Sequence, residues 1–147
     1  MIVAVGCDHG GYLLKGELVA AIQALGHTVV DAGTGGPEPV DYPDFAAVVA
    51  RSVAAGEADL GVLVCGTGIG MSIAANKVPG AYAARAHDCY SARMARLHNA
   101  ANILTMGGRV IGPGLAREVL EAFLNTQPSE EERHQRRRQK VVGLEGG

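Results

Sequence analysis

Short apolar segments alternate with amphipathic segments along the whole chain, and this alternation restricts the fold more than any other feature. The apolar segments are rich in β-branched residues and predict strands over residues 2–6, 27–31, 60–65, 81–85 and 102–107. Helical spacing of apolar residues predicts helices over residues 11–25, 42–56, 70–77, 88–98, 113–124 and about 129–142. Strands that are apolar throughout are typical of a parallel sheet covered on both faces. We therefore expect one domain over residues 1–147, with a Rossmann-like three-layer α/β/α fold, a five-stranded parallel sheet and an extended C-terminal helix.

The composition indicates a globular chain of nearly balanced charge. Of the 147 residues, 48% are hydrophobic and 19% are charged, and the net charge is −2. The longest apolar runs are far shorter than the roughly 20 residues that cross a bilayer. The N-terminus lacks the basic residues and the long apolar run of a signal peptide. We expect a cytoplasmic protein that binds neither nucleic acid nor membranes.

The three cysteines have neither disulfide-framework nor metal-site spacing. The sequence therefore predicts reduced thiols, no bound metal and no cofactor. We interpret Cys7 and Cys89 as structural residues.

Glycine-rich segments follow three of the predicted strands, over residues 6–11, 65–70 and 107–109. Ligands of parallel α/β sheets bind beyond the carboxyl ends of the strands. Glycine lets the backbone approach a ligand closely. In residues 65–70 the glycines also precede a predicted helix, where backbone amides can bind an anion.

The known phosphate-binding loops do not fit these segments. Asp8 stands where a dinucleotide fingerprint needs its second glycine, and Tyr12 follows Gly11 where a Walker A loop needs lysine. Met71 stands where a thiol phosphatase after Cys65 needs arginine. Cys65 itself occupies the place of the aspartate of a phosphoacceptor domain.

Proton transfer at a carbon acid fits Cys65 better. A thiol at a helix N-terminus has a pKa below the usual value of about 8.5, so its thiolate can act as a base near neutral pH. Removal of a proton next to a carbonyl gives an enediolate, and amides of residues 66–70 would bind its oxyanion. The alternative interpretation of Cys65 is a buried structural thiol.

Several segments, in order, resemble the ribose-5-phosphate isomerase B family. They are residues 6–11 (GCDHGG), 41–43 (DYP), 65–70 (CGTGIG), 73–77 (IAANK), 98–99 (HN), 108–109 (GR) and the tail Arg133-His134-x-x-Arg137. The resemblance extends to about residue 140. This family includes allose-6-phosphate and galactose-6-phosphate isomerases, which are similar in the same segments.

The resemblance implies a reaction and catalytic residues. It implies interconversion of D-ribose 5-phosphate and D-ribulose 5-phosphate through an enediolate, in the pentose phosphate pathway. Cys65 resembles the base that moves the proton between C1 and C2, and Thr67 places a hydroxyl nearby. His98 resembles the acid that opens the furanose ring.

The resemblance also implies binding residues and a partner. Asp8 and Asn99 would bind sugar hydroxyls, and a phosphate clamp would hold the other end of the substrate. The implied substrate-binding set is Asp8, His9, Tyr42, Gly66, Gly68, Ile69, Gly70, Asn99, Arg109, Arg133 and Arg137, of which His9 and the three arginines form the clamp. Family members share each site between two subunits, so a homodimer or a dimer of dimers is implied, with the C-terminal arginines reaching across.

Some points stay open at the level of sequence. Some relatives use a glutamate after the glycine loop as the base; here that residue is Met71, which leaves only the cysteine mechanism. Arg136 or Arg138 could take the role of Arg137, and Tyr42 could equally be a packing residue. The alternative functions are isomerisation of allose or galactose 6-phosphate, and non-catalytic binding of a sugar phosphate or nucleotide.

Overall fold

Five parallel strands form the central sheet of the structure, which is a computed structural model describing residues 1–146. The order across the sheet is β2-β1-β3-β5-β4. The strands are β1 (Ile2–Cys7), β2 (Thr28–Asp31), β3 (Leu60–Cys65), β4 (Ala83–Arg85) and β5 (Ile103–Gly107). Because β1, β3 and β5 are neighbours, the three glycine-rich segments that follow them meet at one edge of the sheet.

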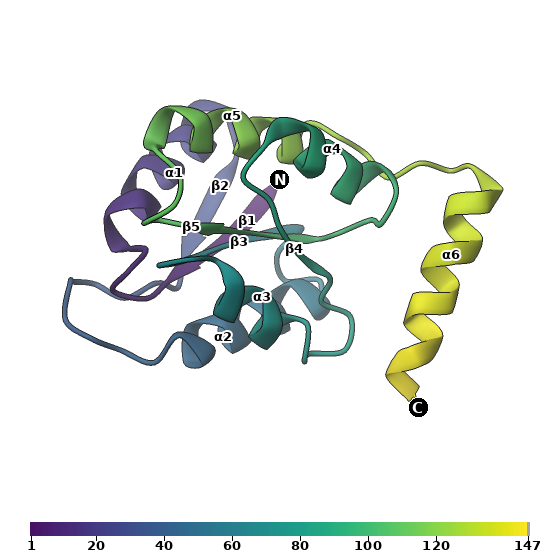
Figure 1. Ribbon diagram of the computed structural model, residues 1–147, viewed down its shortest axis with the longest axis horizontal. Coiled ribbons are helices and arrows are strands. Elements are labelled where there is room, and N and C mark those ends of the chain that lie inside the picture. Colours follow the sequence, from purple (N-terminus) through teal and green to yellow (C-terminus); the bar gives the residue numbers. More distant parts are fainter. Residues whose placement is uncertain (147) are drawn as a thin grey trace.

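Helices cover both faces of this sheet, as the sequence predicted. Figure 1 shows α1 (Tyr12–Ala24), α4 (Cys89–Leu97) and α5 (Pro113–Leu124) on one face, and α2 (Tyr42–Ala54) and α3 (Ile69–Ala75) on the other. The three-layer α/β/α prediction is therefore confirmed.

Each face of the sheet has its own apolar core. Val62 and Val64 pack on the side of α1 and α5, where Phe123 is fully buried. Leu63 and Cys65 point to the other side and pack with residues of α2 and α3 such as Val49. Complete burial of one large apolar side chain contributes about 1.5–3 kcal/mol. The need to fill both cores explains why the strands lack the polar–apolar alternation of a one-sided sheet.

Helix α6 (Glu132–Gly143) projects away from these layers and leads to the C-terminal turn η1 (Leu144–Gly146), as Figure 1 shows. The predicted start near residue 129 is three residues early. The Ser129 amide instead donates to the Leu97 carbonyl at 2.8 Å, and the Ser129 hydroxyl accepts from the Glu131 amide at 3.1 Å. These bonds tie the segment to the end of α4, so the helix begins only after it.

Strand β4 also begins later than the predicted residue 81, at Ala83. The Tyr82 amide donates to the Asn102 side chain at 2.8 Å, so a side chain provides its partner in place of a neighbouring strand.

Among the described helices, none combines the length and hydropathy needed to cross a bilayer.

Candidate active site

The loops after β1, β3 and β5 are joined by backbone hydrogen bonds at the carboxyl edge of the sheet. The Asp8 amide donates to the Val64 carbonyl at 3.2 Å, and the Gly108 amide donates to the Cys65 carbonyl at 2.8 Å. The Arg109 amide donates to the Gly66 carbonyl at 3.0 Å. The three segments singled out in the sequence therefore form one continuous surface around Cys65.

Cys65 is the last residue of the central strand β3 and lies at the boundary between core and solvent. It retains 5% exposure, whereas Cys7 at the end of the adjacent strand has none. The Gly68 amide donates to the Cys65 sulfur at 3.1 Å. The sulfur of Cys65 is therefore held by a donor from the loop that follows its strand.

The loop between Cys65 and α3 depends on glycine at position 68. Gly68 has a φ of +79°, and a Cβ at this residue would lie 2.8 Å from the Met106 carbonyl carbon. The Ile69 amide donates to the Thr67 hydroxyl at 3.2 Å, so both Gly68 and Ile69 amides have partners inside the loop. Their predicted contact with an oxyanion, and that of the Gly66 and Gly70 amides, stays a prediction.

Side chains on β4, just after β4 and on β5 form hydrogen bonds with the backbone of this loop and of the end of β5, and the sequence interpretation missed them. The Arg85 Nε donates to the Thr67 carbonyl at 2.7 Å, and the Thr105 hydroxyl donates to the Gly68 carbonyl at 3.0 Å. His87 Nε2 accepts the Gly107 amide at 2.9 Å. Burial, followed by the charge of Arg85, lowers the pKa of His87, which favours the neutral acceptor form. The only feature of the sequence that could have indicated this role is that Arg85 and His87 lie two residues apart at a strand end, and therefore on the same side of the chain.

Four predicted binding residues, Asp8, His9, Tyr42 and Arg109, lie around the same loop. The Asp8 carboxylate accepts the Gly10 amide at 2.9 Å and the Gly11 amide at 3.2 Å, and it is nearly buried. His9 Nδ1 accepts the Val40 amide at 3.2 Å, which ties the turn after β1 to the loop before α2. Asp8 therefore shapes the turn, while His9 is fixed through one of its two ring nitrogens.

Tyr42 and Arg109 lie directly against the glycines of the loop. A Cβ on Gly70 would be 2.7 Å from the Tyr42 ring, and a Cβ on Gly66 would be 3.1 Å from Arg109 Nη1. Both side chains are exposed at their other atoms. The absence of side chains at positions 66 and 70 thus makes room for the residues predicted to bind substrate.

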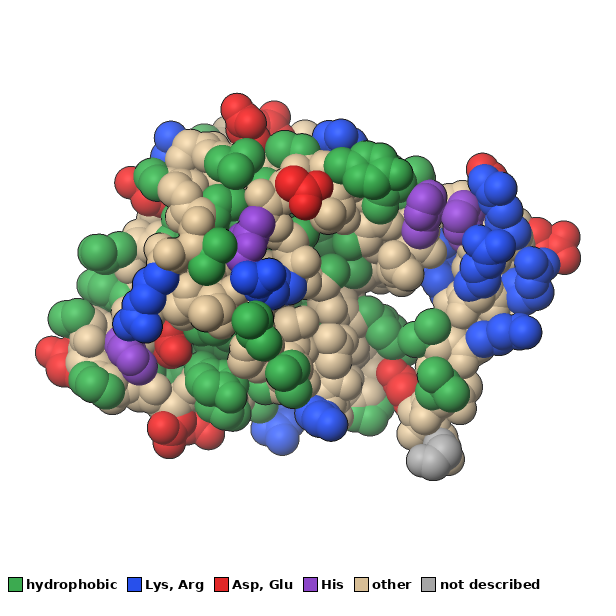
Figure 2. Space-filling model, viewed as in Figure 1, with side chains coloured by type: hydrophobic (Ala, Val, Ile, Leu, Met, Phe, Trp, Pro, Cys, Tyr) green, Lys and Arg blue, Asp and Glu red, His purple; other side chains and the backbone are tan. Residues whose placement is uncertain are grey.

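The other predicted residues lie elsewhere, around a cavity of about 930 Å³ between α6 and the body of the protein. Figure 2 shows this hollow, with Lys and Arg side chains gathered along the helix. His98, Asn99, Arg133 and Arg137 all line the cavity. The remaining lining residues are Asn76, Tyr82, Ala83, Ala84, Ala100, Ala101, Asn102, His134, Arg138, Val141 and Val142.

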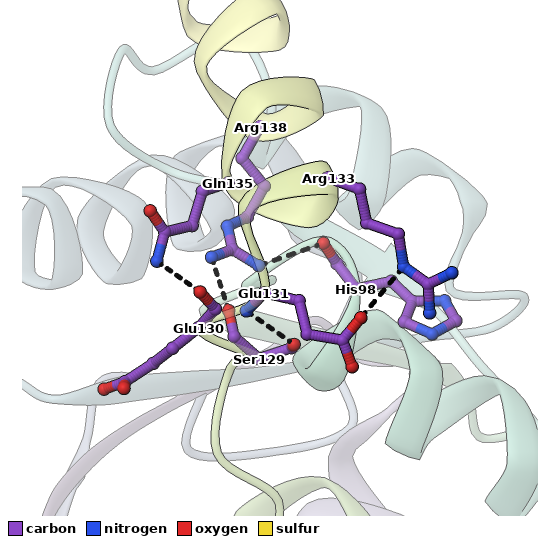
Figure 3. Close-up of polar contacts among 7 residues, drawn as sticks. All are labelled: His98, Ser129, Glu130, Glu131, Arg133, Gln135 and Arg138. Carbon is purple, nitrogen blue, oxygen red and sulfur yellow. Dashed lines mark hydrogen bonds and ion pairs between the residues drawn. The ribbon is translucent and has the colours of Figure 1, made fainter.

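Arg138 attaches α6 to the body, as Figure 3 shows. Its guanidinium donates to the Ser129 carbonyl at 2.7 Å and to the His98 carbonyl at 3.3 Å. Arg133 forms an ion pair with Glu131 at 2.9 Å. Arg136 is exposed and does not line the cavity. Of the three arginines left open by the sequence, Arg137 is the one that faces the cavity without these backbone bonds.

Two imidazoles stack at the top of α6. The rings of His98 and His134 are 4.3 Å apart at their centroids and 11° from parallel. Burial, the neighbouring His98 and the charge of Arg133 together lower the pKa of His134. A neutral His134 can lie against His98 without charge repulsion, so the stack fixes the plane of the ring predicted to act as the acid.

Within one chain the structure thus divides the predicted site into two groups. The strand-end group contains Cys65, the 66–70 loop, Asp8, His9, Tyr42 and Arg109, and the cavity group contains His98, Asn99, Arg133 and Arg137. None of the strand-end residues lines the cavity beside α6.

Known proteins resemble this arrangement over nearly its full length. Residues 3–141 match the family described as Ribose/Galactose Isomerase. The chain belongs to this family. It is 46% identical over 143 residues to ribose-5-phosphate isomerase B of Escherichia coli, covering 97% of this chain and 95% of the relative. The type B ribose 5-phosphate isomerase of Trypanosoma brucei has a structure that matches with a TM-score of 0.95, at 49% identity and with 97% of each chain covered.

Other members of the family have different names. The galactose-6-phosphate isomerase subunit LacB of Clostridium acetobutylicum is 42% identical over 86% of this chain and 73% of its own length. The D-erythrulose-4-phosphate isomerase of Pectobacterium atrosepticum is 43% identical over 85% of this chain and 83% of its own length. The protein is therefore an isomerase of the ribose-5-phosphate isomerase B family, as the sequence predicted, and the interpretation as a non-catalytic binding protein is dropped.

Proposed function

We propose that this isomerase interconverts D-ribose 5-phosphate and D-ribulose 5-phosphate in the cytoplasm, with Cys65 as the base. The observation that supports it most is the position of the Cys65 sulfur. It lies at the end of the central strand, accepts an amide hydrogen bond and adjoins a glycine-rich loop against which Tyr42 and Arg109 lie. A hydrogen-bond donor at the sulfur and a position at the boundary between core and solvent support the assignment of Cys65 as the base.

The chemistry needs a base and an acid in succession. His98 donates a proton to the ring oxygen as the bond from C1 to that oxygen breaks, and the C1 hydroxyl releases its own proton to solvent, which produces the open-chain aldehyde. The Cys65 thiolate then removes the proton from C2, and the electron pair moves to the carbonyl oxygen to give an enediolate. Return of the proton to C1, together with transfer of the C2 hydroxyl proton to the oxygen on C1, completes the ketose without any net oxidation. Amide donors around the oxyanion each contribute about 10²–10³ in rate.

The division of the site residues supports a site made by two copies of the chain. The cavity beside α6 contains His98, Arg133 and Arg137 but not Cys65, and the strand-end group contains Cys65 but not His98. Val141 and Val142 line the same cavity and are about half exposed, at 50% and 48%. A second copy that covered these valines would bring its own strand end to the His98 group and complete two equal sites.

Charge supports a phosphorylated substrate. Arg133 and Arg137 lie four residues apart and therefore on the same side of α6. Their guanidinium groups suit a phosphate dianion, which accepts paired hydrogen bonds. In the proposed dimer they would face His9 and Arg109 of the other copy, and these groups together would balance the phosphate charge.

The choice of ribose over a hexose rests on the relatives. The ribose-5-phosphate isomerase B of E. coli matches over 95% of its length, whereas the galactose-6-phosphate isomerase subunit matches over 73%. The pocket that distinguishes a five-carbon from a six-carbon sugar phosphate would be formed by both chains of the proposed dimer. A panel of ribose, allose and galactose phosphates and of erythrulose 4-phosphate tests this part of the proposal, and the highest kcat/KM is expected with ribose 5-phosphate.

The base is tested by Cys65→Ala, with Cys89→Ser as the matched control. C65A should lose at least about 10²-fold in kcat, the lower range for loss of a general base, while still binding a phosphate analogue. C89S should keep wild-type kcat, because Cys89 lies at the start of α4. Both proteins should be insensitive to a chelator. Full activity of C65A would exclude Cys65 as the base.

A further inference from the structure

One peptide group connects the Cys65 sulfur to a cation. The peptide bond between Thr67 and Gly68 donates through the Gly68 amide to Cys65 Sγ at 3.1 Å. Its carbonyl, which belongs to Thr67, accepts from Arg85 Nε at 2.7 Å. Arg85 is the last residue of the edge strand β4, two strands away from Cys65 in the sheet.

A cation at the carbonyl end of a peptide strengthens the donor at its other end. Hydrogen bonds in series polarise one another, and the bond from a guanidinium is charge-assisted. The polarised Gly68 amide interacts more favourably with a sulfur anion than with a neutral thiol. The positive φ of Gly68 allows this peptide to point its two ends at Arg85 and Cys65.

We propose that Arg85 is a positioning residue of the isomerase, which stabilises the thiolate of Cys65 through the Thr67–Gly68 peptide. The proposal deepens the proposed function, since it rests on Cys65 acting as the base. Among residues 1–146, no carboxylate forms an ion pair with Arg85, so its charge is not neutralised by a protein group.

The loop itself has other supports, which separates an electrostatic role of Arg85 from a structural one. The Thr105 hydroxyl holds the Gly68 carbonyl at 3.0 Å, and β5 packs against Gly68. Removal of the Arg85 side chain, which is exposed, therefore leaves the loop held by buried groups. We expect variants of Arg85 to fold with the stability of the wild type.

Other charged groups near the sulfur are also part of the test. Arg109 lies over Gly66, Asp8 accepts the Gly10 amide, and His87 lies next to Arg85 and accepts the Gly107 amide. These three residues stay unchanged in every variant. Because burial and, after it, the charge of Arg85 lower the pKa of His87, the variants report on Arg85 together with its effect on His87.

The experiment measures alkylation of Cys65 by iodoacetamide as a function of pH, in the full chain carrying C89S, with C65S/C89S as the blank. R85M should lower the alkylation rate near neutral pH by about two- to tenfold, and it should shift the rise of the profile to higher pH. R85K, which keeps the charge, should restore the wild-type profile. R85Q, which keeps only a neutral donor, should behave like R85M. The control R51M removes an exposed arginine of α2 and should match the wild type.

Steady-state kinetics with ribose 5-phosphate complete the test. R85M should lower kcat by a similar factor and leave KM unchanged. A wild-type alkylation profile in R85M, or a raised KM with unchanged kcat, would overturn the proposal and make Arg85 a structural or ligand-binding residue. Because alkylation needs no turnover, it tests Arg85 even if C65A proves active and the proposed base is wrong.

Discussion

Mixed dimers provide the sharpest test of a site divided between two chains. C65A removes the base from the strand-end group, and H98N removes the proposed acid from the cavity group. In a dimer that contains one chain of each kind, one site combines both defects. The other site combines the intact Cys65 of one chain with the intact His98 of its partner, so half of the sites in a mixed dimer are restored.

The expected magnitude follows from this count. Random pairing of the two variants at equal amounts gives about half mixed dimers, so about a quarter of all sites are intact. The coexpressed pair should therefore show about a quarter of the wild-type kcat per chain, while each variant alone shows almost none. A dimer of dimers gives the same fraction, because pairing within each site-forming dimer is again random.

The assay follows ribulose 5-phosphate formation in the unfractionated mixture, after mass spectrometry has confirmed equal amounts of both chains. The matched control pairs C65A with R109M, since both changes affect the strand-end group and no pairing restores a site. Activity of the C65A and H98N mixture no higher than the average of the two separate variants would refute the divided site. The proposal that His98 acts on the same substrate as the Cys65 of the partner chain would then be wrong.

Further predictions concern stability and reactivity. G68A should lower the free energy of unfolding by roughly 1–3 kcal/mol, because alanine at a φ of +79° is strained and its Cβ would contact β5. Gly16 lies in the interior of α1 with open space around it. G16A should therefore raise the free energy of unfolding by roughly 0.5–1 kcal/mol in the same urea titration. Burial lowers the pKa of His87 in the folded state, so the unfolded state binds more protons, and the stability present above about pH 6.5 declines as the pH falls below that value. H87Q should reduce this decline in urea titrations at neutral and acidic pH, and a decline equal to that of the wild type would contradict the assignment. Burial also raises the pKa of Cys7. Peptide mapping after alkylation near neutral pH should therefore find the label on Cys65 and none on Cys7. Comparable labelling of both cysteines would show that β1 opens readily.

The sequence was sufficient for the sheet because the physical requirement is local. A strand buried on both faces needs a continuous apolar run, and β3 contains six buried residues in succession. The boundaries that failed depend on distant partners. Strand β4 begins after Tyr82 because Asn102 takes the Tyr82 amide, and α6 begins late because Ser129 bonds to Leu97. Neither contact leaves a mark in the local pattern.

The candidate site was predictable where glycine forms part of it. The loop from Cys65 to Gly70 is recognisable because its conformation excludes larger residues at position 68. Arg85, at the end of the edge strand, and His87, two residues after it, were missed because they bond to backbone groups. A side chain that bonds to a backbone carbonyl or amide has no sequence motif. Residue spacing did not predict that His98 and Cys65 lie in separate groups within one chain, and only the family resemblance implied a site shared between two subunits.

The register between β1 and β3 places the cysteines at the ends of these two strands, Cys7 and Cys65, in different surroundings. Cys7 pairs with Val64, so Cys65 lies one residue further along its strand. Side chains alternate between the faces of a sheet, and this single step places the two thiols on opposite sides. Cys7 joins the core beneath α1, where burial raises its pKa and keeps it protonated. Cys65 faces the side of α3, whose preceding loop provides an amide for its sulfur. Each cysteine ends its strand and has a glycine three residues later, Gly10 or Gly68, but only Gly68 has a positive φ. The different surroundings of the two thiols are therefore determined by the register between β1 and β3 and by the conformation of the loop after β3.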